Sequence, residues 1–101
     1  MSTAVAPQIT EKAFQAQVVQ LAKVYHWEPV YHTFDSRRSC PGFPDLVMLR
    51  GKRIIYAELK TEHGKLSMYQ SLWLEALRKV PQNEVFIWRP SDFDDIEKVL
   101  R

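Results

Sequence analysis

Two apolar runs joined by a short glycine-containing link constrain the fold of this chain most. The runs are 45–50 (DLVMLR) and 53–60 (RIIYAELK), and only Gly51 and one lysine separate them. β-branched and aromatic residues favour strands, and a two-residue link with glycine favours an antiparallel hairpin. The sequence therefore predicts a hairpin in which Arg50 faces Arg53 across the turn.

The same register brings charged residues together at the open end of the hairpin. Counting back from the turn, Asp45 stands opposite Glu58, and Lys60 lies two residues further along on the same face. Cβ atoms of opposed residues are roughly 4.5–5.5 Å apart. The remaining residues of the face are apolar, namely Val47, Leu49, Ile54 and Tyr56. Because apolar faces are covered by other elements, the two carboxylates are expected at the edge of a helix-covered surface.

Two carboxylates at this separation, in a partly buried environment, repel each other unless a cation compensates their negative charge. Mg²⁺ prefers oxygen ligands and is commonly held by one or two carboxylates together with phosphate oxygens of a substrate. Lys60 would add a positive charge that holds a water or stabilises charge developing on phosphorus. The pattern indicates metal-dependent phosphodiester hydrolysis. The alternative is a solvated strand end, where Glu58 and Lys60 form a surface ion pair of little energetic value.

Three helices are predicted from the spacing of apolar residues and from capping residues. The first spans 10–26 with Thr10 as N-cap, and its buried stripe is Phe14, Val18, Leu21 and Tyr25. The second spans 67–80, and its predicted buried face is Tyr69, Trp73, Ala76, Leu77 and Val80. A short C-terminal helix is expected to begin at Ser91 as N-cap.

Four strands complete an α/β fold. They are predicted at 30–34, 45–50, 53–60 and 84–89, with a Gly/Pro-containing loop over 35–44. The third strand, second helix and fourth strand form a parallel βαβ crossover, whereas the hairpin is antiparallel. We therefore expect a mixed central sheet flanked by helices and followed by a short C-terminal helix. Residues 1–8 are expected to be a disordered lead-in and 9–101 a single domain.

The charge distribution is more informative than the net charge. A net charge of +2 is too small to indicate a nucleic-acid partner by itself. Basic residues nevertheless gather in the middle third of the chain, at Arg37, Arg38, Arg50, Lys52, Arg53, Lys60 and Lys65. A local basic surface suits a phosphate backbone. For the three residues around the hairpin turn, simple solvation of the tip explains the charge equally well.

Cysteine content and hydropathy indicate the cellular compartment of the protein. Cys40 is the single cysteine, so an internal disulfide is excluded, and the spacing of a zinc site is absent. No apolar run approaches the roughly 20 residues that span a bilayer. The first residues lack the basic and apolar regions of a signal peptide. We expect a cytoplasmic protein with no membrane partner and no small-molecule cofactor.

Two further polar residues have alternative interpretations. Glu11 shares the face of the apolar stripe of the first helix, but it is also a first-turn acid that favours the helix dipole. Ser67 and Gln70 fit a capping box, in which Gln70 bonds back to the Ser67 amide. Gln70 is therefore either a helix cap or a supporting residue of the site.

These residues together resemble the VRR-NUC (virus-type replication-repair nuclease) branch of the PD-(D/E)xK nuclease superfamily. The matching elements are a first helix with Glu11, Gly-Phe-Pro-Asp at 42–45, Glu58-Leu59-Lys60 at 58–60 and Gln70 in the following helix. The segment 84–100 (EVFIWRPSDFDDIEKVL) is similar to the last strand and helix of the family. The likeness extends from about residue 9 over nearly the whole chain, although the turn before the last strand lacks an expected glycine.

The resemblance implies a divalent-metal-dependent DNA endonuclease with the restriction-endonuclease-like αβββαβ core. Asp45 and Glu58 would be the ligands of Mg²⁺ (or Mn²⁺). The main-chain carbonyl of Leu59 would complete the metal shell, and Glu11 would be a possible further metal-side carboxylate. Lys60 would be the catalytic lysine. Hydrolysis would leave a 5′-phosphate and a 3′-hydroxyl.

The resemblance also implies a substrate and an assembly. Small stand-alone members resemble Holliday-junction resolvases, are expected to act as homodimers on branched or junction DNA, and are often encoded by phages. Gln70 would orient the site from the second helix. Arg37 and Arg38 are candidates for contacts to backbone phosphates, with ordinary loop solvation as the alternative, and Lys65 is a further candidate.

Two other classes of function compete with the nuclease. One is a catalytically silent DNA-binding or nuclease-accessory module that keeps the fold. The other is a host-directed interaction protein that uses the basic loop. The intact set of Asp45, Glu58 and Lys60 argues against the first, because a degenerate site loses a member of such a set.

Overall fold

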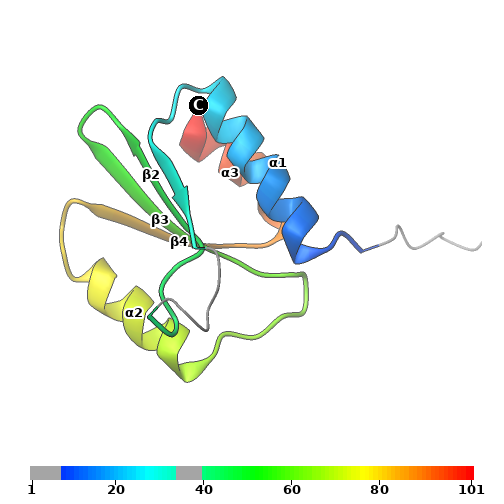
Figure 1. Ribbon diagram of the computed structural model, residues 1–101, viewed down its shortest axis with the longest axis vertical. Helices are drawn as coiled ribbons and strands as arrows, with labels where there is room; N and C mark the ends of the chain where they lie inside the picture. Colours follow the sequence, from blue (N-terminus) through cyan, green and yellow to red (C-terminus); the bar gives the residue numbers. More distant parts are fainter. Residues whose placement is uncertain (1–7, 34–39) are drawn as a thin grey trace, which may run out of the picture.

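A four-stranded sheet separates two layers of helices in the computed structural model, which describes residues 8–33 and 40–101 (Figure 1). The elements are α1 (Glu11–Val24), β1 (Val30–His32), β2 (Leu46–Arg50), β3 (Arg53–Leu59), α2 (Met68–Arg78), β4 (Asn83–Trp88), a 3₁₀-helix η1 (Pro90–Asp92) and α3 (Phe93–Leu100). The strand order is β1-β2-β3-β4, with β3 and β4 parallel and the other neighbours antiparallel. The predicted α/β class with a mixed sheet is confirmed.

The predicted hairpin register is also confirmed. The ladder between β2 and β3 runs from Leu46 opposite Ala57 to Arg50 opposite Arg53. Gly51 has a φ of +58°, in the left-handed region that a tight hairpin turn requires and that glycine adopts most readily. One further step back along the ladder leads to Asp45 and Glu58, so the turn determines the placement of both carboxylates.

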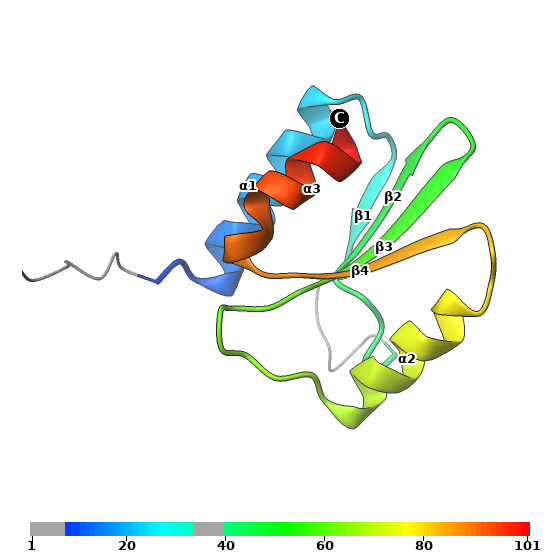
Figure 2. The same ribbon diagram turned by 180° about the vertical axis from the view of Figure 1, so that it is seen from behind.

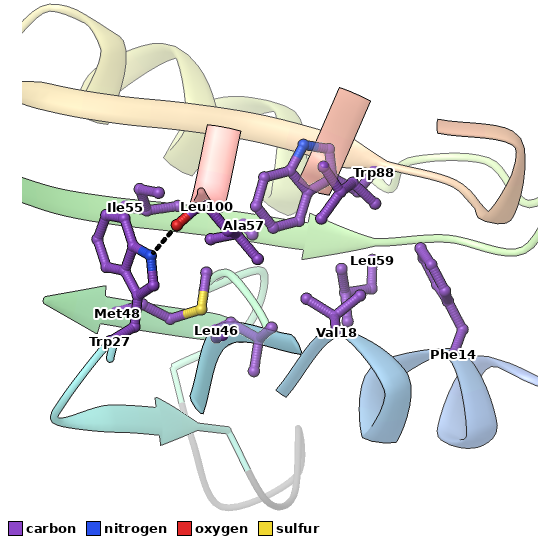
Figure 3. Close-up of a cluster of buried hydrophobic side chains, with 12 residues drawn as sticks. Phe14, Val18, Trp27, Leu46, Met48, Ile55, Ala57, Leu59, Trp88 and Leu100 are labelled. Atoms are coloured by element: carbon purple, nitrogen blue, oxygen red, sulfur yellow. Dashed lines mark hydrogen bonds between the residues drawn. The ribbon is translucent and has the colours of Figure 1, made fainter. Parts of the chain in front are cut away.

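Helices α1 and α3 cover one face of the sheet and form the main core with it (Figure 3). Alternate residues of β2 and β3 point to this face, and those buried are Leu46, Met48, Ile55, Ala57 and Leu59. From α1 the buried residues are Phe14, Val18 and Ala22, and Leu21 and Tyr25 are only partly buried. The predicted stripe is therefore right at its first two positions, and Ala22 continues it because the helix contacts the sheet at four-residue intervals.

Helix α2 lies on the opposite face, and its predicted buried side is largely wrong (Figure 2). Leu74 is the buried residue of α2, and of the predicted residues only Trp73 and Leu77 are partly buried. The helix approaches the sheet through Gln70, Leu74 and Leu77, a stripe with helical spacing that starts with a polar residue. Apolar periodicity alone selects the neighbouring stripe, because it ignores the polar contact of Gln70.

The C-terminal helix begins differently from the prediction. Ser91 lies within η1 and is not the N-cap; its backbone amide donates to Glu62 Oε2 at 3.1 Å. The carboxylate of Asp92 instead accepts from the Arg89 amide at 2.8 Å. Residues 1–7, most of the expected lead-in, lie outside the described residues. No helix within the described parts has the length and apolar character needed to cross a membrane.

Arg50 joins the end of the hairpin to the ends of α1 and α3. Its Nη1 donates to the carbonyl oxygens of Tyr25 at 2.9 Å and Leu100 at 2.8 Å, and Nη2 donates to Arg101 O at 3.3 Å. The guanidinium also lies 4.6 Å from the centre of the Trp27 ring. Solvation of the hairpin tip is therefore the wrong interpretation for Arg50, which has a structural role.

We expect Arg50→Ala to lower the free energy of unfolding by about 2–3 kcal/mol, because it removes charge-assisted hydrogen bonds and a cation–π contact. Urea denaturation followed by tryptophan fluorescence measures the change. Lys52→Ala, at the exposed turn of the same hairpin, is the matched control and should change stability by less than about 0.5 kcal/mol. Equal effects of the two variants would contradict the role given to Arg50.

Candidate active site

The predicted carboxylates meet where β2 begins and β3 ends. Asp45 directly precedes β2, and its Oδ2 accepts a hydrogen bond from the Leu59 backbone amide at 2.8 Å. The segment entering Asp45 is held by Thr33, whose amide donates to Asp45 O at 2.9 Å and whose hydroxyl donates to Pro44 O at 3.0 Å. Backbone and side chain of Asp45 are therefore both fixed before any ligand binds.

Glu58 is the buried acid of the site, with 1% of its surface exposed. Its Oε2 accepts from Gln70 Nε2 at 2.8 Å and lies 3.5 Å from Lys60 Nζ. Its Oε1 is buried and has no hydrogen-bond donor among the described residues, and Glu58 can form a hydrogen bond with the side chain of Asp45 only while one of the two acids is protonated. Leaving a carboxylate oxygen buried without a partner is costly. A bound cation would supply the partner that this oxygen lacks when both acids are ionised.

Burial raises the pKa of all three acids of the site, and the charge of Asp45 adds to the shift for Glu58 and Glu11. Burial first, and then the charge of Asp45, raise the pKa of Glu58 to about 8, although Lys60 opposes the shift. Burial also raises the pKa of Asp45, against the hydrogen bond from Leu59. Burial and the charge of Asp45 raise the pKa of Glu11 as well. The raised pKa values mean that the positive charge nearby does not offset the negative charge of the ionised acids. A metal ion would supply the missing positive charge.

Gln70 combines the two roles that the sequence left as alternatives. The side-chain oxygen Oε1 of Gln70 accepts a hydrogen bond from the Ser67 backbone amide at 2.8 Å. The backbone amide of Gln70 donates to Ser67 Oγ at 3.1 Å, which completes the capping box. The opposite end of the side-chain amide, Nε2, donates to Glu58. The cap therefore fixes the rotamer that presents Nε2 to the carboxylate.

The loop before Asp45 holds the N-terminal end of α2 against the site. Gly42 has a φ of +83°, and a Cβ atom there would lie 2.4 Å from the backbone carbon of Tyr69. The Phe43 ring meets Trp73 edge-on, with centroids 5.2 Å apart, and meets Tyr56 in the same way at 6.4 Å. The loop and helix are in such close contact that only a residue without a side chain fits at position 42.

A cavity of about 410 Å³ opens beside Asp45. Its walls come from α1, from the loop around Gly42, and from Gln70; the lining residues are Glu11, Lys12, Gln15, Thr33, Cys40, Gly42, Phe43, Asp45 and Gln70. Of these residues, Lys12, Gln15 and Thr33 were not predicted from the sequence. The four-residue spacing from Glu11 to Gln15 was an available signal, because such residues share a helix face.

Of the residues predicted to contact DNA, only Lys65 lies in the part of the chain that the structure describes. Arg37 and Arg38 lie outside the described residues. Lys65 is an exposed residue of the loop before α2 and does not line the cavity. Leu59, the predicted source of a carbonyl ligand, contributes its amide to Asp45.

Within 8–33 and 40–101, no three His, Cys, Asp or Glu side chains form a complete metal-binding group. Mg²⁺ typically takes only one or two carboxylates from the protein, and water, backbone carbonyls or substrate phosphate supply the other ligands. Asp45 and Glu58, with its unpartnered oxygen, fit that type of site. They do not fit the closed nitrogen and sulfur sites of structural zinc.

Comparison with known families gives an independent view of the same residues. The model of the VRR-NUC domain matches residues 6–86, a span that includes Glu11, Asp45, Glu58, Lys60 and Gln70. The chain belongs to the VRR-NUC family. It is thus a nuclease-type domain, which implies DNA as its substrate.

A solved structure described as "VRR_NUC domain protein" has the same fold as this VRR-NUC domain. The two superpose with a TM-score of 0.71 at 19% sequence identity, over 92% of this chain and 86% of the other. Comparison with curated proteins gives no match. The family resemblance predicted from the sequence is therefore confirmed, and so is the mixed four-stranded sheet with flanking helices.

Proposed function

We propose that this VRR-NUC domain is a Mg²⁺- or Mn²⁺-dependent DNA endonuclease that hydrolyses phosphodiester bonds. The observation that carries the proposal is the buried Glu58 carboxylate. One of its oxygens has no partner, and the other is held by Gln70 and faces Lys60. Asp45, close enough to raise the pKa of Glu58, provides the second carboxylate.

In this proposal Asp45 and Oε1 of Glu58 would hold the metal. The carbonyl of Leu59 would be a further ligand, and Glu11 would be a possible additional carboxylate. The chemistry that a divalent ion supplies when bound is polarisation of the scissile phosphate and a lowered pKa of water. Gln70 holds Oε2 of Glu58, which leaves Oε1 as the oxygen that would bind the metal.

Lys60 would act on the reacting groups. Its ammonium lies 3.5 Å from Glu58 Oε2 and is largely buried, with 13% of the side chain exposed. A positive charge in this buried environment would orient the attacking water and stabilise the negative charge that develops on the phosphate. In-line attack would then leave a 5′-phosphate and a 3′-hydroxyl.

We further propose that the preferred substrate is branched DNA, such as a four-way junction, and that two copies act together in the cytoplasm. One copy carries one site, and a junction with two-fold symmetry requires two cuts related by that symmetry. Arg37, Arg38 and Lys65 are the proposed contacts to backbone phosphates. Lys12 adds a positive charge at the wall of the cavity.

A cleavage assay tests the proposal. The protein is incubated with four-way junction, flap, nicked and linear DNA, each with Mg²⁺, with Mn²⁺ or with EDTA. We expect cutting with either metal, most of all at the junction, and none with EDTA. Binding without cutting on every substrate and with both metals would instead identify a silent DNA-binding module.

The shifted acids predict how metal and pH affect stability. Glu58 has a pKa of about 8 when folded and an ordinary value of 4.5. The unfolded chain therefore loses this proton first as pH rises, and the metal-free protein should lose stability between these two values. The raised pKa values of Asp45 and Glu11 act in the same direction. We expect a loss of about 2–4 kcal/mol between pH 5 and 8, which Mg²⁺ largely restores at the upper end.

Thermal denaturation from pH 5 to pH 9, with and without Mg²⁺, measures this effect. Glu58→Gln is the matched variant, because it keeps the shape of the side chain and cannot ionise. Both the pH slope and the stabilisation by Mg²⁺ should shrink in Glu58→Gln. Equal stabilisation of wild type and variant by Mg²⁺ would show that the metal binds elsewhere.

A further inference from the structure

The first two turns of α1 supply three of the side chains that line the cavity beside Asp45. They are Glu11, Lys12 and Gln15, whose spacing places them on one side of the helix. Glu11 faces the catalytic centre, since the charges of Asp45 and Lys60 both act on its pKa. Lys12 acts on the pKa of neither Glu11 nor Asp45, so its ammonium lies apart from the carboxylates. The cavity therefore has an acidic end at the catalytic centre and a second end with the cation and amide of α1.

Lys12 and Gln15 have no partner of their own within the part of the chain that the structure describes. The ion pairs there involve Arg53, Lys60 and Arg101, and Lys12 takes part in none of them. Gln15 is half-buried, yet its side-chain amide forms no hydrogen bond with another described residue. The cavity has a volume of about 410 Å³, within the range of roughly 300–1,000 Å³ of ligand sites. Unpaired polar groups that converge on such a cavity indicate a binding site.

We propose that Lys12 and Gln15 bind a backbone phosphate of the DNA substrate, the one next to the scissile phosphate on the cleaved strand. This site rests on the proposed nuclease function and adds a second phosphate contact to it. The ammonium carries three hydrogen-bond donors and the amide carries two, and both side chains commonly contact DNA phosphates. An unpaired cation at the wall of a cavity selects an anionic ligand over a neutral one.

The charges of the cavity determine where this phosphate lies. Glu11 and Asp45 would repel an anion at their end, except for the scissile phosphate that a bound metal holds. At the other end a phosphate meets the donors of Lys12 and Gln15. Gln15 lies about 6 Å along the helix axis from Glu11, which is about the length of one sugar-phosphate repeat. Holding two successive phosphates would fix the direction of the strand and align the scissile bond for in-line attack.

DNA binding in EDTA tests the two residues independently of cleavage. Fluorescence anisotropy measures the dissociation constant for a four-way junction at salt concentrations from about 50 to 200 mM. Lys12→Ala should weaken binding about 10-fold and reduce the slope of log Kd against log salt by about 0.9, the change expected for one lost phosphate contact. Gln15→Ala should weaken binding about 3-fold without changing the slope, because the amide carries no charge.

Two further variants are the controls. Lys23→Ala removes an exposed lysine in the last turn of the same helix, outside the cavity, and should keep the wild-type affinity and slope. Lys12→Arg keeps the positive charge and should bind within about 2-fold of wild type. Circular dichroism verifies that each variant is folded.

A chemical change in the DNA identifies the phosphate. A methylphosphonate replaces one charged phosphate oxygen by a methyl group, and it is introduced at each position near the branch point in turn. At the contacted phosphate it should weaken wild-type binding about 10-fold and have little effect on Lys12→Ala, in which the contact is already lost. This position should lie next to the bond that wild type cuts with Mg²⁺.

The outcomes separate this phosphate site from the nuclease itself. Equal effects of Lys12→Ala and Lys23→Ala would overturn the site, and so would methylphosphonate effects that add to Lys12→Ala at every position. Non-additivity only at a phosphate remote from the cut would overturn its placement beside the scissile phosphate. A wild type that gives the expected binding results but cuts no DNA with Mg²⁺ or Mn²⁺ would support the phosphate contact and overturn the proposed nuclease.

Discussion

Lys60→Ala should slow metal-dependent DNA cleavage by about 10²–10⁴-fold while DNA affinity changes little. The expected loss is large because Lys60 is the cation that faces the buried Glu58 carboxylate, and its side chain is only 13% exposed. Removing it takes away charge stabilisation that is strongest in the transition state. The fold should survive, since burial already raises the pKa of Glu58 to about 8 and the acid can keep its proton.

Single-turnover cleavage at saturating protein, with Mg²⁺, measures the chemical step apart from binding. Lys52→Ala, which removes an exposed lysine at the far end of the hairpin, is the control and should cut at the wild-type rate. Lys65→Ala is expected to weaken DNA binding without slowing the chemical step. If Lys60→Ala lowered binding and cutting by the same factor, Lys60 would be a phosphate contact and not a catalytic residue.

The parts of the fold that the sequence predicts well are specified locally. A glycine-containing link of two residues determines the hairpin register, and this register carries Asp45 to a position opposite Glu58. The same holds for the caps, since Thr10 accepts from the Ala13 amide at 3.1 Å. Such features depend on residues a few positions apart, so a reading of the sequence captures them.

The features that the sequence did not predict depend on contacts between distant segments. Arg50 bonds to carbonyls of Tyr25 and Leu100, which are 25 and 50 positions away. Helix α2 was assigned the wrong buried face because a buried carboxylate, Glu58, attracts its polar residue Gln70 toward the sheet. Tertiary contacts thus override apolar periodicity wherever a buried polar group needs a partner.

The residues of the candidate site and the placement of Asp45 opposite Glu58 were predictable from the sequence, but the hydrogen bonds within the site were not. Sequence patterns and family resemblance select the two carboxylates, Lys60 and Gln70, because their chemistry belongs together. They do not show that Gln70 serves as cap and as donor to Glu58 at once. They also do not show which oxygen is free. Only the packing of α2 against the strand ends determines that Oε1 of Glu58 lacks a partner.

Gly42→Ala should be among the most destabilising single-methyl additions in this chain. A Cβ atom at this position would lie 2.4 Å from the carbon and 2.6 Å from the oxygen of the Tyr69 carbonyl group. Both neighbours are backbone atoms, so a rotamer change cannot relieve the overlap. With a φ of +83° the alanine is also strained in itself. We expect the free energy of unfolding to fall by about 2–4 kcal/mol.

Gly51→Ala separates the effect of close contact from that of backbone conformation. Gly51 also has a positive φ, of +58°, but no atom lies within 4 Å of the Cβ that would be added. Its replacement should therefore cost only about 1 kcal/mol. Chemical denaturation of both variants measures the difference.

Gly42→Ala should also impair catalysis in the protein that remains folded. The methyl group would push the first turn of α2 away from the loop, and Gln70 in that turn would lose its 2.8 Å bond to Glu58. Cleavage should then fall by at least about 10-fold at a temperature where the variant is folded. A Gly42→Ala protein as stable and active as Gly51→Ala would show that the loop and α2 are not in the close contact on which the geometry of the site depends.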